Sequence, residues 1–190
     1  MSTSATTLAR PLPSVRVQTL ATIAAIVGAV AVPQLFHVAG AALGLGTALG
    51  ETFLPMHLPI ILVGLLAGPY AGIIAGVFGP LASFAISGMP GIGMLPFMMI
   101  ELGTYGLVAG LLRPTKAPTV GKVLITQVAG RLVRAAAILV AVLALGNQAI
   151  AISTIWTSVA AGLPGLILQW ALLPLVIHLV DKAQGTSLEG

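Results

Sequence analysis

Two arginines, Arg131 and Arg134, stand three residues apart in VAGRLVRAAAILVAVLAL, an apolar stretch typical of a membrane span. A charged side chain at bilayer depth is costly, and such residues usually pair with one another or line a polar cavity. The preceding apolar stretch contains a single acidic residue, Glu101. These three side chains are therefore the first candidates for a functional site.

Counting along the two helices places the three charges at similar depth. Arg113 and Lys122 mark the polar edge of these spans. With a rise of about 1.5 Å per residue, Glu101 lies about 18 Å from Arg113, and Arg134 lies about 18 Å from Lys122. Arg131 lies about 13 Å from Lys122, one turn closer to the edge. Because consecutive spans run antiparallel, we expect Glu101 to meet one of the arginines.

This cluster has three interpretations. It is a structural ion pair, either Glu101–Arg134 or Glu101–Arg131. Alternatively, two cations against one anion leave one arginine over to bind an anionic or strongly polar ligand. The planar guanidinium suits a carboxylate or a phosphate. The third interpretation is a proton relay.

Three further residues are candidates for substrate binding on the outer side of the membrane. His57, in LPMHLP, lies near the outer start of the second span and is either a packing histidine or a ligand-binding one. Asn147 lies in the polar loop GNQAIAIST. Trp156 begins the sixth span, where tryptophan is typical of the membrane interface.

Several chemistries lack the residues that they require. The sequence contains no cysteine, no HExxH and no GxxxxGK[ST] motif. It therefore predicts no metal site, no cofactor and no nucleotide bound in the P-loop manner. A hydrolytic enzyme is poorly supported, because the serines have no histidine partner at matching depth.

The composition indicates what must position these residues. The 190 residues are 58% hydrophobic and 6% charged, with a mean hydropathy of +1.12. Soluble domains are about 25% charged, so the sequence predicts an integral membrane protein. The apolar runs are continuous rather than alternating, which favours helices over a β-barrel. A spanning helix needs about 20 apolar residues.

On this basis the sequence predicts an all-α protein with six transmembrane helices. We expect Pro33 and the glycine-rich segment after it to end the first span, followed by a long loop over residues 39–51. A tight turn is expected at Gly68-Pro69. The predicted spans are Val17–Phe36, Thr52–Ala67, Tyr70–Ser87, Met94–Leu112, Val123–Leu145 and Ile155–Val180.

Basic residues predict the orientation. They lie before the first span, between the fourth and fifth, and after the sixth, at Arg10, Arg16, Arg113, Lys116, Lys122 and Lys182. By the positive-inside rule both termini are cytoplasmic. The net charge of +4 is then a topology signal, and no nucleic-acid partner is expected.

We therefore divide the chain into three parts. Residues 1–16 form a cytoplasmic N-terminal segment, residues 17–182 a six-helix membrane domain, and residues 183–190 a C-terminal tail. The last residues of that tail, GTSLEG, have the look of a cloning remnant.

The first span carries a stripe of small residues, Ala21, Ala25 and Ala29. Small residues spaced by four let helices approach closely in lipid. The stripe serves either packing within the chain or docking onto another membrane subunit, and a first helix so rich in alanine favours the second.

One long region, residues 55–112, resembles the substrate-binding S component of energy-coupling factor (ECF) vitamin transporters. The elements that carry the resemblance are MHLP, GLLAGPYAG, GPL, the GMP loop and MIELGTYGLVAGLL, together with the later VAGR. Within the family, the pattern is most similar to pantothenate-type and pyridoxine- or hydroxymethylpyrimidine-type members.

The resemblance implies a function. An S component binds a small water-soluble vitamin from outside the bacterial plasma membrane. It docks through small residues of its first helix onto a transmembrane coupling (T) subunit, and two partner ATPases drive transport. We expect a pocket in the outer half, between the 39–51 loop and helices four to six, with Glu101, Arg131 and Arg134 on its floor.

Pantothenate is the first expectation, because its carboxylate suits the surplus arginine. The alternatives are pyridoxine, hydroxymethylpyrimidine or another vitamin precursor. If the chain is not an S component, the alternatives are a solitary carrier driven by an ion gradient, an intramembrane enzyme or a membrane scaffold.

Overall fold

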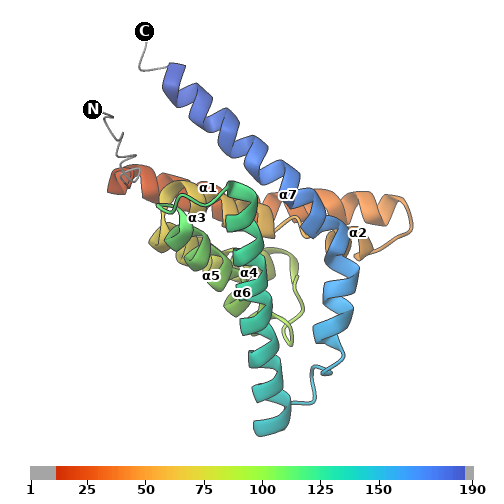
Figure 1. The fold of residues 1–190 in the computed structure, drawn as a ribbon. Helices are drawn as coiled ribbons and strands as arrows, with labels where there is room; N and C mark the ends of the chain where they lie inside the picture. Colours follow the sequence, from red (N-terminus) through yellow and green to blue (C-terminus); the bar gives the residue numbers. More distant parts are fainter. Residues whose placement is uncertain (1–11, 187–190) are drawn as a thin grey trace.

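The structure, a computed structural model, describes residues 12–186, with side chains as far as Ala183. The predictions for residues 1–11 and 187–190, in the N-terminal segment and the C-terminal tail, lie outside the described residues. Every regular element in the described part is a helix. These are α1 (Val15–Ala42), α2 (Ala48–Phe53), α3 (His57–Ala67), α4 (Pro69–Ser87), α5 (Leu95–Leu112), α6 (Thr119–Leu139), the π-helical turn η1 (Val140–Ala144) and α7 (Thr154–Thr186) (Figure 1).

Six helical segments of the described chain are long and apolar enough to cross a membrane. The second combines α2 with α3, and the fifth combines α6 with η1. The predicted all-α, six-span fold class is therefore confirmed, and the chain is a multi-pass membrane protein. The orientation with both termini inside stays a prediction.

The first helix is longer than the sequence analysis predicts. The expected end at Phe36, attributed to Pro33 and the glycines after it, is wrong, because α1 continues through Pro33 to Ala42. Proline removes one hydrogen bond inside a helix, but membrane helices tolerate this where neighbouring helices cover the site. Pro33 is buried.

The predicted loop over residues 39–51 is consequently mostly helix. Only residues 43–47 connect α1 to α2, and α2 then forms a short helix of its own. The second span is broken between Phe53 and His57 instead of running straight from Thr52. At the break, Leu54 adopts the left-handed conformation (φ 50°, ψ 49°), and the following Pro55 has no N–H with which to continue a helix.

Glycines set the spacing of the central helices. A Cβ placed on Gly72 of α4 would collide with the backbone of Gly106 in α5, and a Cβ on Gly106 would collide with Gly72. A Cβ on Gly64 of α3 would lie 2.6 Å from the carbonyl oxygen of Gly106. Because small residues allow such close backbone approach in lipid, α3, α4 and α5 form a tight core.

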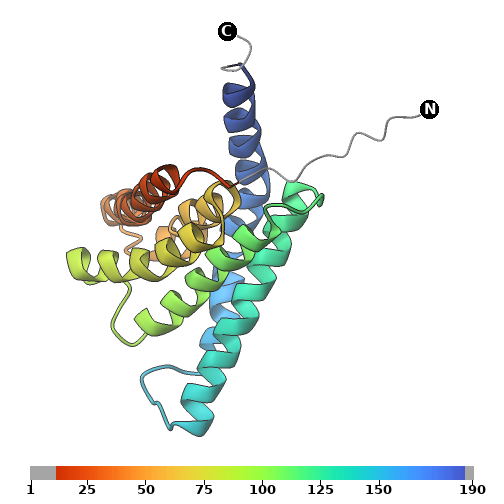
Figure 2. The same ribbon diagram turned by 90° about the vertical axis from the view of Figure 1, so that its left-hand side faces the viewer.

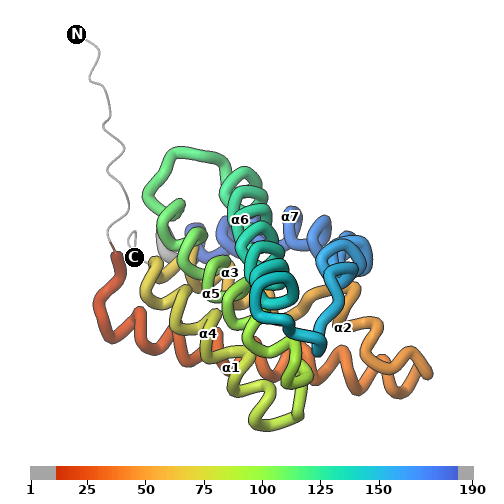
Figure 3. The backbone as a smooth tube through the Cα atoms, turned by 90° about the horizontal axis from the view of Figure 1, so that it is seen from below, coloured from red at the N-terminus to blue at the C-terminus, as the bar shows by residue number. Residues whose placement is uncertain are grey.

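The helices stack in a definite order. Seen from below, α1, α4, α5, α6 and α7 follow one another across the molecule (Figure 3). Figure 1 shows α6 running steeply across the direction of α1. Figure 2 shows α6 and α7 next to each other, and α2 also packs against α7. The side chains between α2, α5, α6 and α7 therefore come from distant parts of the sequence.

The alanine stripe of α1 lies inside this stack. Ala25 and Ala29 are buried, and Ala21 packs against the same apolar cluster. A Cβ on Gly79 of α4 would lie 3.1 Å from the Cβ of Ala29. Ala25 and Ala29 therefore pack α1 onto α4 within the chain. Docking of the partly buried Ala21 and the rest of the stripe onto a second subunit stays a prediction.

Candidate functional site

A cavity of about 500 Å³ opens between the broken second span and helices α5, α6 and α7. Sites for small molecules usually measure about 300–1,000 Å³, so this space suits a vitamin-sized ligand. Its wall also includes Pro33 and His37 of α1 and residues 89–91 of the loop before α5. The cavity thus lies between the segments where the sequence analysis expects a pocket.

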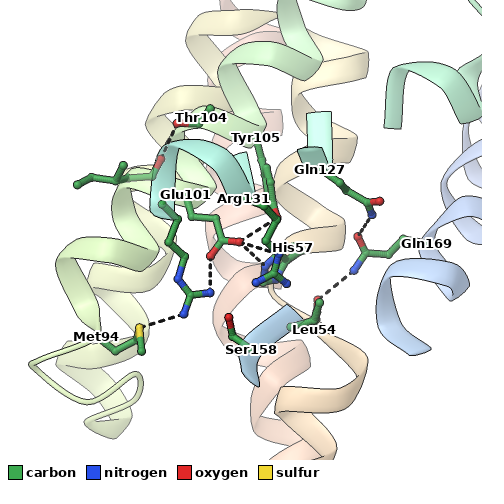
Figure 4. A network of polar contacts seen from close by, with 12 residues as sticks. Leu54, His57, Met94, Glu101, Thr104, Tyr105, Gln127, Arg131, Ser158 and Gln169 are labelled. Carbon is green, nitrogen blue, oxygen red and sulfur yellow. Dashed lines mark hydrogen bonds and ion pairs between the residues drawn. The ribbon is translucent and has the colours of Figure 1, made fainter. Parts of the chain in front are cut away.

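Glu101 is the centre of a buried polar cluster on the cavity wall (Figure 4). It is 1% exposed. Its Oε2 accepts a hydrogen bond of 3.0 Å from Nη1 of Arg134, and its Oε1 accepts one of 2.9 Å from the hydroxyl of Tyr105. The second guanidinium nitrogen of Arg134, Nη2, donates to the sulfur of Met94 at 3.3 Å. Glu101 and Arg134 therefore form a buried ion pair, in which Tyr105 also bonds to the glutamate and Met94 to the arginine.

Arg131 contacts the same carboxylate in a looser way. Its Nε lies 3.2 Å from Oε1 of Glu101, within ion-pair distance but not aligned for a hydrogen bond. The Nε and Nη2 atoms are buried without a hydrogen-bond partner. Both arginines line the cavity, and together with Glu101 they leave one formal positive charge in excess. We predicted that Glu101 meets one arginine; in the structure both Arg131 and Arg134 contact it, and we call these three residues the triad.

His57 joins this cluster from the first turn of α3. It is 4% exposed and lines the cavity. Its Nε2 lies 3.9 Å from Oε1 of Glu101, and neither ring nitrogen has a hydrogen-bond partner. The ring also packs against Tyr105, with 5.2 Å between the ring centroids. The structure thus places His57 on the cavity wall beside Glu101 and Tyr105, and its role in binding stays a prediction.

The remaining walls differ in character. Four of the chain's six methionines line the cavity, at Met56, Met89, Met94 and Met98. Methionine side chains adapt to irregular apolar shapes, so this wall suits an apolar ligand body.

The α2 side of the cavity is polar. Glu51, an exposed residue of α2, lies there, and its Oε1 accepts a 3.0 Å hydrogen bond from the hydroxyl of Thr47. The cavity therefore offers cationic, apolar and acceptor groups in separate places.

A family model for the substrate-specific component of ECF transporters matches residues 15–177. The chain belongs to this family. Comparisons with curated proteins and with solved structures find no match. Substrate-specific components confer the specificity of transport and are not enzymes, and family membership implies partnering with T and ATPase subunits and a small substrate.

Two residues that the sequence analysis selected do not line the cavity of this S component. The side chain of Asn147 turns back onto its own loop, where its Oδ1 accepts a 2.8 Å hydrogen bond from the Ala149 N–H. Trp156 is 74% exposed on the outside of α7. Within residues 12–186 there is no group of three His, Cys, Asp or Glu side chains that could hold a metal ion.

Sequence reasoning also missed a second buried polar group. Gln127 of α6 and Gln169 of α7 are nearly fully buried and hydrogen-bonded to each other at 3.1 Å. They carry no charge, so a search for charges inside apolar runs passes over them. An uncharged amide in a predicted span is itself a signal, because it too must find a partner in lipid.

Proposed function

We propose that this S component binds a small anionic, water-soluble vitamin in the cavity, with pantothenate as the first substrate. The observation that carries the proposal is the excess positive charge of the Glu101–Arg131–Arg134 triad on the cavity wall. Arg134 is already engaged with Glu101 and Met94. Arg131 lines the cavity and contacts Glu101 only through an ion pair without an aligned hydrogen bond, so a ligand carboxylate beside it would balance the charge of the triad.

The other walls suit the rest of pantothenate. Its methyl-bearing carbon would contact the methionine wall, while its two hydroxyl groups would donate to acceptors such as Glu51. His57, which also lines the cavity, would contact the ligand from the start of α3. Pyridoxine and hydroxymethylpyrimidine remain the alternatives. Both lack a carboxylate, so neither would use the excess charge.

Binding measurements on the purified full-length chain test this proposal. Pantothenate should bind at least tenfold more tightly than panthenol, the same molecule with an alcohol in place of the carboxylate. Arg131→Met should abolish this discrimination by weakening pantothenate binding at least tenfold, which corresponds to about 1.4 kcal/mol. Arg16→Met, at an exposed arginine outside the cavity wall, is the matched control. Preference for pyridoxine, or equal binding of pantothenate and panthenol, would refute the proposal.

For transport we propose that the chain works in the bacterial plasma membrane with a T subunit and two ATPases, its termini in the cytoplasm. Family membership supports this arrangement. The competing possibility is a solitary carrier. Uptake of labelled pantothenate should stop when the coupling subunit is deleted, whereas a solitary carrier would continue to transport.

A further inference from the structure

A continuous series of side-chain hydrogen bonds connects α7 to the break in the second span. The indole Nε1 of Trp170 donates to Oε1 of Gln127 at 2.7 Å. Nε2 of Gln127 donates to Oε1 of Gln169 at 3.1 Å, and Nε2 of Gln169 donates to the carbonyl oxygen of Leu54 at 3.3 Å. Figure 4 shows the last two of these bonds in line, beside the charged cluster.

The last acceptor in this series lies at an unusual place in the backbone. Among the described residues, Leu54 is the only non-glycine with a positive φ. Its carbonyl oxygen also accepts the N–H of His57 at 3.0 Å, which begins α3. Leu54 and the three residues after it all line the cavity. Gln169 therefore holds the carbonyl from which the His57 wall of the cavity starts.

The amides are costly unless they are all satisfied. A buried amide without a hydrogen bond loses several kcal/mol relative to water, and no water is available in the bilayer core. The exposed fractions of Gln127 and Gln169 are 4% and 2%. Apolar side chains would pack α6 against α7 without this risk, since lipid-facing helices need no amide to associate.

We infer that Gln169, supported by Gln127, is a positioning residue that fixes the Leu54–His57 wall of the substrate cavity. It does not line the cavity itself. It acts through the Leu54 carbonyl, which sets where His57 enters the site. The binding part of this inference rests on the proposed function, whereas the positioning part does not.

Hydrogen exchange measures the positioning directly and needs no ligand. The full-length chain in lipid nanodiscs is labelled in deuterated buffer, and uptake is followed by mass spectrometry on a peptide that contains the His57 amide. Gln169→Met removes the donor to Leu54 and keeps the side-chain length. Gln34→Met is the matched control, because Gln34 is another amide in a membrane helix, and its buried Nε2 makes no hydrogen bond.

The loss of one hydrogen bond of ordinary net strength corresponds to about a two- to tenfold effect. Gln169→Met should therefore speed exchange at the His57 amide and weaken pantothenate binding by about two- to tenfold each, while Gln34→Met changes neither. Unchanged exchange and binding in Gln169→Met would overturn the inference. So would faster exchange spread evenly over all helices, which indicates a general loss of packing.

A second variant keeps the test decisive if Gln169→Met does not fold. Gln169→Asn keeps the amide but is one methylene shorter, so it cannot bridge Gln127 and Leu54 at once. It should speed exchange at His57 in the same direction, and normal exchange in this variant would equally overturn the inference. Failure of the wild type to bind pantothenate would refute the proposed substrate alone, because the exchange measurement contains no substrate.

Discussion

Glu101→Gln removes the one negative charge of the triad while keeping its shape. In the wild type the Tyr105 hydroxyl donates to the Glu101 carboxylate at 2.9 Å. The amide oxygen of the glutamine can accept the same hydrogen bond. What disappears is the counter-charge for two guanidinium groups, whose nitrogens lie 3.0 Å and 3.2 Å from the carboxylate. The variant thus isolates the electrostatic contribution of Glu101.

The expected loss is large. Removing one partner of a buried ion pair costs about 3–5 kcal/mol, because the remaining charge is left buried without compensation. Here two cations remain on one helix, 12% and 9% exposed in their side chains. We therefore expect the free energy of unfolding of Glu101→Gln to fall by about 3–5 kcal/mol. Reversible unfolding in mixed micelles measures this quantity.

A control and a second substitution sharpen the experiment. Glu51→Gln makes the same chemical change at an exposed glutamate and should alter the unfolding free energy by less than about 0.5 kcal/mol. Adding Arg134→Met to Glu101→Gln removes one of the two stranded cations and should recover part of the loss. If Glu101→Gln is as stable as Glu51→Gln, the carboxylate does not hold the arginines and the reasoning fails.

Two further predictions concern helix packing, and unfolding measurements check both. Gly106→Ala puts a Cβ against the Gly72 backbone, which cannot move aside, and should cost about 1–3 kcal/mol; Gly91→Ala has open space and should cost far less. Ala29→Leu overpacks a fully buried position and should cost about 1–3 kcal/mol. Ala31→Leu, on the exposed side of α1, should be nearly neutral, and equal losses at both alanines would contradict the packing of α1 onto α4.

Depth along the helices predicted where the charged triad lies, and the spacing of the two arginines could have predicted that both contact Glu101. Depth counting placed Glu101 level with Arg134, and the structure joins them at 3.0 Å. The prediction that only one arginine meets Glu101 was too narrow. Residues three apart share one face of a helix, so Arg131 and Arg134 had to approach the same carboxylate together.

The rest of the cavity could not be read from one chain. At the break, the carbonyl oxygen of Leu54 accepts a hydrogen bond from Gln169, 115 residues later in the sequence. The continuation of α1 through Pro33 depends on neighbours that cover it, which proline's local preference does not reveal. Asn147 and Trp156 were selected for residue type and depth alone, and neither property tells which way a side chain turns around its helix or loop.

The glycine motifs of the sequence have a physical role that connects packing to charge. At about 100° per residue, Glu101 and Tyr105 lie on one face of α5, while Gly103, Gly106 and Gly110 lie on the opposite face. The glycines let α5 pack closely against α4. A Cβ placed on Gly110, for example, would collide with the backbone around Pro69. The face that remains meets α6.

A glycine of α6, Gly130, also lets α6 approach the face of α5 that carries Glu101 and Tyr105. A Cβ on Gly130 would collide with the ring of Tyr105 and lie 3.1 Å from the carbonyl oxygen of Glu101. Gly130 directly precedes Arg131, so the close approach of the two helices brings the carboxylate to the arginines. Isolated charges at this depth would be costly, so the triad depends on the two helices lying this close together. The close approach that glycines allow between α4, α5 and α6 therefore brings the three charges of the triad together on the cavity wall.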